Sequence, residues 1–196
     1  MLSRTAQNLY WMGRYIERAD ATARLVEMGR RMTMLPSANA EWRSVARASG
    51  CAPDLAEDPK ARDRDIIVRL VLDPDNRSSI RCCIAQARAN AKAIRTALTS
   101  DMWEALNDHW RLLDTLDGDE VIAELPIWLD WAKQRAAAFR GAAETSLLRN
   151  DGFIFLKLGE LIERAEMTLR LLDVKYYVLL PETDVVGGGR DFHQWT

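Results

Sequence analysis

Apolar residues recur at helical spacing along almost the whole chain, and sparse glycine and proline residues mark the breaks between helical stretches. The first stretch runs from about Ser3, its expected N-cap, to Pro36. The last follows the turn at Gly152 and reaches Pro181. No segment shows the sustained alternation of apolar and polar residues that a half-buried strand requires. The pattern therefore predicts an all-α protein, a helical bundle.

Shorter helices are predicted between these two, at residues 40–48, 65–72, 75–98, 99–113 and 120–148. Residues 50–62 are polar and contain proline, so they are predicted to form a loop. Asp75 or Asn76 is expected to cap the helix that follows, and residue 99 or 100 the next one. Pro126 falls in the early turns of the 120–148 helix, where it is either tolerated or kinks the helix.

The first and last helices carry two copies of one motif. Residues 13–28 read GRYIERADATARLVEM, and residues 159–174 read GELIERAEMTLRLLDV, with eight of sixteen positions identical. Two unrelated amphipathic helices would share apolar periodicity, but they would not also share a glycine, a threonine and several charged residues. The repeat predicts two long helices packed around a pseudo-twofold axis.

On a helix with 100° per residue, the charged positions of each copy form one stripe beside the apolar face. The glycine that opens each copy leaves room for a close approach of two backbones. The candidate site residues are the charged members of the two copies: Glu17, Arg18, Asp20, Arg24, Glu163, Arg164, Glu166 and Arg170.

These charges have two interpretations. In one they form an ion-pair network that fixes the register of the bundle, with glutamates of one helix set against arginines of the other. In the other they line a polar pocket where carboxylates and arginines hold a ligand or move a proton. A dimetal site would require Glu-x-x-His on facing helices. The only histidines, His109 and His193, lie elsewhere, so no metal site is predicted.

Charge composition sets limits on the partners. The 27 basic and 29 acidic residues are mixed along the chain and give a formal net charge of −2. Since no basic block stands out, no nucleic-acid or membrane partner is expected. The chain has no apolar run of membrane-spanning length. Self-association remains open.

The cysteines and the N-terminus point to the cytoplasm. The count of three is odd, and the neighbours Cys82 and Cys83 are unsuited to pair with each other, so no disulfide framework is expected. Charges at Arg4, Arg14 and Glu17 interrupt any secretory pattern. Both neighbouring cysteines are predicted to be inert because no histidine is near them in sequence.

Other motifs are weak. The run from Gly187 to Arg190 lacks the Gly-Lys-Ser/Thr ending of a phosphate-binding loop and is read as a flexible connector. The helix start near Asn76 could bind an anion, although such clusters more often cap the helix. No zinc spacing or nucleotide fingerprint is visible, so no cofactor is predicted.

Five blocks of sequence resemble the alpha-E domain family, a bacterial domain of unknown function. They lie at residues 1–19, 75–80, 87–91, 102–107 and 158–176. The resemblance implies an alpha-E-like domain over residues 1–181. The glycine-containing tail at 182–196 would begin a further part, since the family usually continues for about a hundred residues more. Arg77 and Ala89 stand where proline and glutamate are common.

The resemblance also implies a function. Alpha-E proteins tend to be encoded beside, or fused to, a circularly permuted ATP-grasp-type amide ligase, often with a transglutaminase-like protease. This chain is therefore expected to be a non-catalytic helical partner, or scaffold, of such a peptide ligase. The alternative is an enzyme in its own right that modifies peptide or amide bonds, with Glu17, Glu163, Arg24 and Arg170 in a central pocket.

Overall fold

The structure is a computed structural model that describes residues 2–34, 41–108 and 110–174. These ranges contain helices and no strand, so the all-α prediction is confirmed. The helices are α1 (Ser3–Met32), α2 (Glu41–Ser49), α3 (Pro53–Glu57), α4 (Asp63–Val71), α5 (Ile80–Ala93), the 3-10 helix η1 (Arg95–Ala97), α6 (Ser100–Asn107), α7 (Trp110–Thr115), α8 (Gly118–Ala123), α9 (Leu125–Ser146) and α10 (Asp151–Val174). The proposed tail at 182–196 lies outside the described residues.

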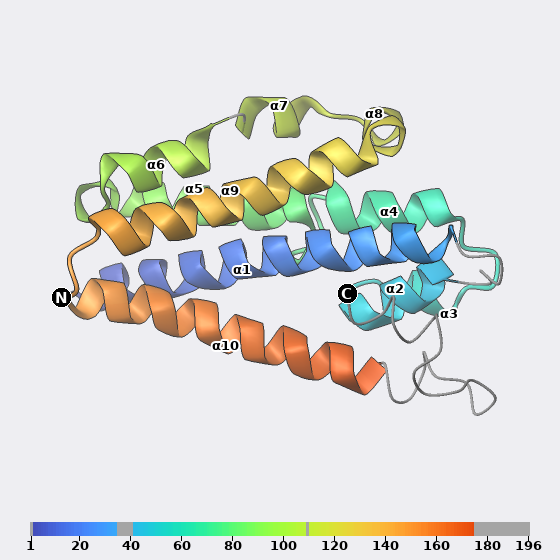
Figure 1. Cartoon of the computed structure of the whole chain (residues 1–196), viewed down its shortest axis with the longest axis horizontal. Coiled ribbons are helices and arrows are strands. Elements are labelled where there is room, and N and C mark those ends of the chain that lie inside the picture. Colours follow the sequence, from blue (N-terminus) through green and yellow to red (C-terminus); the bar gives the residue numbers. More distant parts are fainter. Residues whose placement is uncertain (1, 35–40, 109, 175–196) are drawn as a thin grey trace.

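Helix α1 lies in the middle of the bundle and contacts α10 on one side and α5 and α9 on the other (Figure 1). The two helices of the repeat, α1 and α10, run in the same direction (Figure 1). Helices α5 and α9 run opposite to α1, because Thr22 meets the start of α5 and Lys133 and Arg140 of α9 meet Glu27 and Glu17 in reverse order. None of the described helices is long and apolar enough to cross a membrane.

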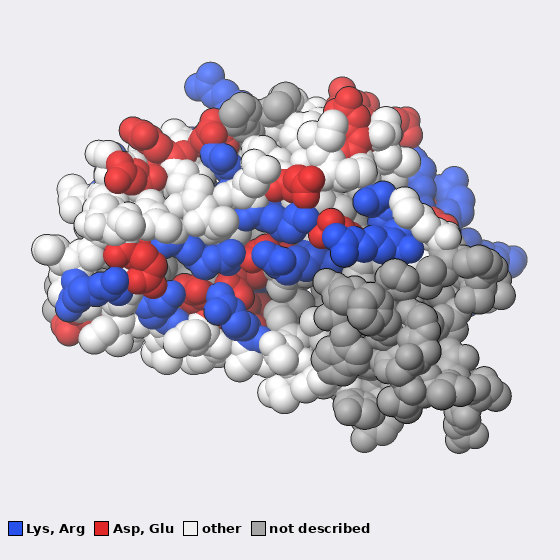
Figure 2. Space-filling view, in the orientation of Figure 1, with Lys and Arg blue, Asp and Glu red and all other residues white. Residues whose placement is uncertain are grey.

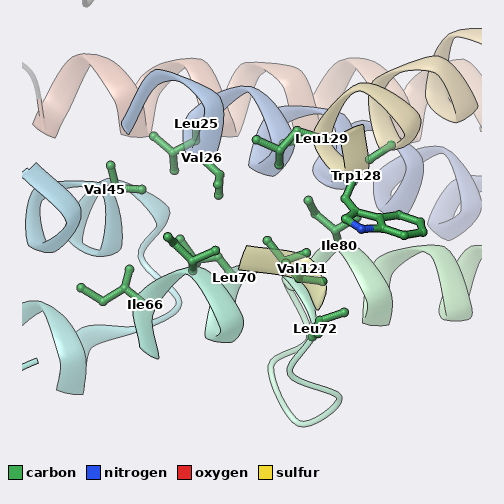
Figure 3. Close-up of a cluster of buried hydrophobic side chains, with 14 of the residues drawn as sticks. Leu25, Val26, Val45, Ile66, Leu70, Leu72, Ile80, Val121, Trp128 and Leu129 are labelled. Atoms are coloured by element: carbon green, nitrogen blue, oxygen red, sulfur yellow. The ribbon is translucent and has the colours of Figure 1, made fainter. Parts of the chain in front are cut away.

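Two adjoining clusters of buried side chains form the core, and α1 contributes to both. Towards the C-terminal end of α1, Leu25 and Val26 pack with Val45, Leu70 and Leu129 from three other helices (Figure 3). Towards its N-terminal end, α1 contributes Leu9, Met12 and Ile16 to a second cluster with α5, α6 and α9. Since burial of one such side chain contributes about 1.5–3 kcal/mol, this apolar face fixes α1 at the centre.

The structure corrects several predicted boundaries. The predicted loop at 50–62 contains α3, which begins at Pro53, where the missing N–H would have no helical partner. The predicted helix at 99–113 is divided, because α6 ends at Asp108, whose backbone is extended. The predicted helix at 120–148 is also divided, since α8 ends at Ala123, Glu124 has a non-helical backbone, and Pro126 stands in the first turn of α9.

The N-caps of α1 and α5 differ from the prediction. Ser3 lies inside α1, and the N-cap position belongs to Leu2. The cap of α5 is Ser79, whose Oγ accepts from the backbone N of Cys82 at 3.1 Å and donates to the carbonyl oxygen of Asp73 at 2.6 Å. Asn76 instead holds the preceding turn, because its amide donates to the carbonyl oxygen of Arg69 at 2.9 Å. Residue 99 was one of the two expected caps of α6, and Thr99 is that cap.

We expect Ser79→Ala to lower stability by about 1–2 kcal/mol, because it removes a buried cap and leaves the Asp73 carbonyl without its donor. The control is Ser3→Ala, which changes an exposed hydroxyl inside the first turn of α1. It should leave the urea unfolding midpoint almost unchanged. Equal losses for the two variants would contradict the assignment of Ser79 as the cap.

Candidate functional site

The two repeat helices touch through their glycines. A Cβ added at Gly159 would lie 2.0 Å from the carbonyl oxygen of Tyr10, and one added at Gly13 would lie 2.3 Å from that of Leu156. Tyr10 stands three residues before Gly13, and Leu156 stands three residues before Gly159. The contact is therefore reciprocal, as the predicted pseudo-twofold relation requires.

One turn further on, each Glu-Arg pair of one copy meets the Glu-Arg pair of the other. Arg164 donates two hydrogen bonds to Glu17, at 2.6 Å from Nε and 3.0 Å from Nη2. Arg18 donates two to Glu163, at 2.7 and 2.9 Å. Both carboxylates are buried, Glu17 with 7% exposure and Glu163 with 1%. The structure thus brings four of the eight candidate residues together in two crossed ion pairs.

A second arginine also binds each carboxylate, and neither of these arginines was among the predicted site residues. On one side, Arg140 of α9 donates to Glu17 at 3.1 Å and to Asp20 at 2.8 Å. On the other side, Arg14 of α1 donates to Glu163 and Glu166, which occupy the equivalent positions in the second copy. Arg14 directly follows the motif glycine, which was an available signal, whereas Arg140 lies outside both copies.

The remaining motif arginines differ between the two copies. Arg24 is 63% exposed and pairs with Asp20 of its own helix at 3.1 Å, so it does not reach α10. Arg170 donates to the carbonyl oxygen of Ser49 at 3.1 Å and to Glu166 at 3.3 Å, and so ties α10 to the end of α2. Both arginines thus bind the carboxylate four residues before them, but only Arg170 is seen to add a hydrogen bond to the end of α2.

The carboxylates hold the arginines in their charged form. Burial lowers the pKa of Arg14 and Arg18, but hydrogen bonds and charge from Glu163, with Tyr10 in the case of Arg14, outweigh it and raise both pKa values. The hydrogen bonds from Arg164 to Glu17 raise the pKa of that arginine as well. These groups are fixed cations rather than proton donors.

The hollow beside the glycine contact is small. A hollow next to Gly13, bounded by Arg140 and Glu160 among others, has a volume of about 10 Å³. That is room for about one water molecule. Acidic and basic side chains alternate in a band between α9 and α10 on the face shown in Figure 2. Within the part of the chain that the structure describes, no group of His, Cys, Asp and Glu side chains could hold a metal ion.

The other candidates separate into two groups. Burial raises the pKa of the Cys82 and Cys83 thiols, which keeps them protonated and agrees with their predicted inertness. The side chain of Asn76 is used within its own turn, where it also accepts from the backbone N of Ser78 at 3.0 Å. His109, His193 and the run from Gly187 to Arg190 lie outside the described residues.

Glu27 gives the network a pH dependence. Burial alone would raise the pKa of its carboxyl, but the hydrogen bond from Lys133 at 2.7 Å lowers it below the ordinary 4.5. Stability from a carboxyl with a lowered pKa is present above pH 4.5 and is lost as pH falls through the folded-state value. We therefore expect Glu27→Gln to flatten the fall of the urea midpoint below pH 4.5. Equal slopes for variant and wild type would contradict this.

A parallel pair of helices joined by crossed Glu–Arg pairs defines a helical domain built on a duplicated Glu-Arg motif. The chain matches the Alpha-E family, described as a predicted alpha-helical domain with a conserved ER motif, over residues 1–196. It belongs to that family. Glu17-Arg18 and Glu163-Arg164 are its two Glu-Arg sequences in the repeat.

The chain is also similar to three mycobacterial proteins. They are the uncharacterized protein Mb2597 of Mycobacterium bovis and the uncharacterized proteins MT2643 and Rv2567 of Mycobacterium tuberculosis, each 27% identical over 192 residues. The match covers 86% of this chain but 22% of each relative. No solved structure gives a significant match.

Proposed function

We propose that this chain is a non-catalytic helical partner of an ATP-grasp-type amide ligase in the cytoplasm, and that it helps to position a substrate for that enzyme. The observation that carries the proposal is the mutual pairing of the two motifs. Glu17 and Glu163 each accept hydrogen bonds from two arginines within the domain. Their charge is used to hold helices together, which is the property of a structural element.

An enzyme of its own would need the same carboxylates to face a substrate. A catalytic acid or base must come within hydrogen-bond reach of the proton that it transfers. The hollow beside Gly13 has room for about one water molecule. Glu17 and Glu163 are buried, and each is held by two arginines of the domain. The geometry therefore supports the scaffold more than the enzyme.

The proposal is tested by purification of the full chain with the ATP-grasp-type ligase of the same organism. We expect a stable complex in which the ligase hydrolyses ATP and forms amide bonds faster than it does alone. The isolated chain should show neither activity. If the ligase neither binds the chain nor responds to it, the proposal is wrong.

Glu163→Gln separates the two functions in the same assay. In the scaffold, this variant loses thermal stability, and any loss of ligase stimulation follows the loss of folded protein. In the enzyme, the folded variant keeps its stability and binding but loses turnover. Activity of the chain alone that disappears in Glu163→Gln would favour the enzyme.

A further inference from the structure

Helix α10 has a second apolar face that nothing in the described structure covers. We call it the outer α10 face: Phe155, Leu158, Ile162, Ala165, Leu169 and Leu172. These positions fall within an arc of about 100° on the helix, the width of a face that normally packs against a core. Its four largest exposed members, Phe155, Leu158, Ile162 and Leu169, are 38–67% exposed. Figure 2 shows uncharged side chains along the lower edge, where Figure 1 places α10.

In the other copy of the repeat, the same apolar face packs in the core. Subtracting the 146 residues that separate Gly13 from Gly159 gives the equivalent positions in α1: Leu9, Met12, Ile16, Ala19, Ala23 and Val26. All six are buried, with exposures of 0–4%. They pack in the two core clusters with side chains of α5 and α9. The same face is therefore covered by a layer of two helices on α1 and is uncovered on α10.

Charge specifies the covering layer further. On α1, helix α9 must bring Arg140 to Glu17 and Asp20. On α10, the equivalent carboxylates already receive Arg14 from α1. The layer that covers α10 therefore needs no cation at this point. Alanines of α5 and α9, such as Ala87, Ala91 and Ala136, lie in the cluster against α1, so small and aliphatic side chains are what such a layer presents.

We propose that the outer α10 face docks two helices of a different polypeptide, both antiparallel to α10, in the place that α5 and α9 hold on α1. A second copy of this chain would contribute its own outer α10 face, which is a single helix. The equivalent face of α1 is covered by two helices. In the mycobacterial relatives the matched segment is 22% of the length, so there such a layer has room within the same polypeptide, whereas for this chain we propose a separate one.

A groove at one end of the face gives the partner an anchor. It has a volume of about 540 Å³ and lies between the N-terminal turns of α1 and α10, with Phe155 and Leu158 in its wall beside Tyr10. An aromatic side chain of the partner that fills this groove would be buried there, as the anchor residues of other interfaces are.

The experiment places a photoreactive phenylalanine analogue at position 158 or 169 of the full chain in cells of its own organism. Position 148 is the matched control, because Leu148 is 76% exposed and precedes α10. We expect at least tenfold more cross-linked product from 158 and 169 than from 148. Mass spectrometry should map the two sites to helices of another polypeptide. Where both sites fall in one helix, they should come in reverse order.

Variants then test the face itself. With the analogue at 158, Leu169→Glu should reduce the cross-linked product at least tenfold, whereas Leu148→Glu should leave it unchanged. Both substitutions change exposed side chains, and circular dichroism melting confirms that the variants are folded.

Three results would overturn the inference: cross-links to a second copy of the chain, sites within one helix in the same order as in α10, or no product above the position-148 control. The identity of the partner tests the proposed function separately. An ATP-grasp-type ligase supports both proposals. If the cross-linked partner is another helical protein, the docking face is supported and the proposed ligase partner is contradicted.

Discussion

Glu163→Gln is expected to lower the free energy of unfolding by about 3 kcal/mol and the melting temperature by roughly 6–12 °C. Glu163 is 1% exposed and is held by Arg14 and Arg18, whose side chains are 12% and 16% exposed. The substitution keeps the shape of the side chain but leaves Arg18 without its counter-charge and Arg14 with Glu166 alone. Breaking a buried pair in this way is more harmful than removing the pair as a whole.

The matched control is Glu57→Gln, which removes the same charge from the surface. Glu57 is 76% exposed and lies 3.5 Å from Arg47. Solvent screens such a pair, so the melting temperature should change by less than about 2 °C. Circular dichroism melting of both variants at one pH and salt concentration provides the measurement.

Glu17→Gln should give the same sign as Glu163→Gln, because the two carboxylates occupy equivalent places in the crossed pairs. A clear fall in melting temperature for both variants is what an ion-pair network requires. Unchanged or raised stability, together with loss of activity of the partnered ligase, would instead favour a functional site, since removing a poorly compensated charge relieves a cost.

Gly159→Ala should destabilise the domain by at least about 2 kcal/mol, although alanine forms helices better than glycine does. Its new methyl group would lie 2.0 Å from the carbonyl oxygen of Tyr10. A backbone atom cannot move aside as a side chain can, so α1 and α10 must separate and their crossed ion pairs must lengthen. The melting temperature should fall by roughly 4–8 °C.

Gly141→Ala is the control for helix propensity. Gly141 is also inside a long helix, α9, but a Cβ there would meet no atom within 4 Å. This variant should gain about 0.5–1 kcal/mol, because alanine loses less backbone freedom on folding. Opposite signs for the two substitutions would show that the glycine of the repeat serves the helix contact. A gain for Gly159→Ala would contradict the close packing.

The helix class and the repeat could be predicted from local sequence. Apolar spacing fixes which residues share a helix face, and identical charges at identical spacing in 13–28 and 159–174 indicate equivalent environments. The end points were less certain. Two predicted helices are divided in the structure, one at Asp108 and the other just before Pro126. The sequence does not show whether a helix continues or stops at such a residue.

Partners across the bundle could not be predicted in the same way. Arg140 pairs with Glu17 and Asp20 because α9 packs against α1 beside these two carboxylates. Nothing in the sequence around Arg140 indicates this contact. Arg24 and Arg170 are the same residue in the two copies, yet one faces solvent and the other binds the end of α2. The packing of distant elements decides which of two identical side chains gains a contact outside its own helix.

The sequence by itself therefore determined the all-α class and the two repeat helices, because these depend on apolar periodicity and on the likeness of two segments. It left open whether the charged stripes pair with each other or line a pocket, and the tertiary structure shows the Glu–Arg pairs between α1 and α10. The tertiary structure alone decided that α1 is covered by α5 and α9 while the outer α10 face is not. Both helices carry the same apolar pattern, and coverage depends on which other segments fold against each one. The same apolar pattern is therefore buried on α1 and exposed on α10.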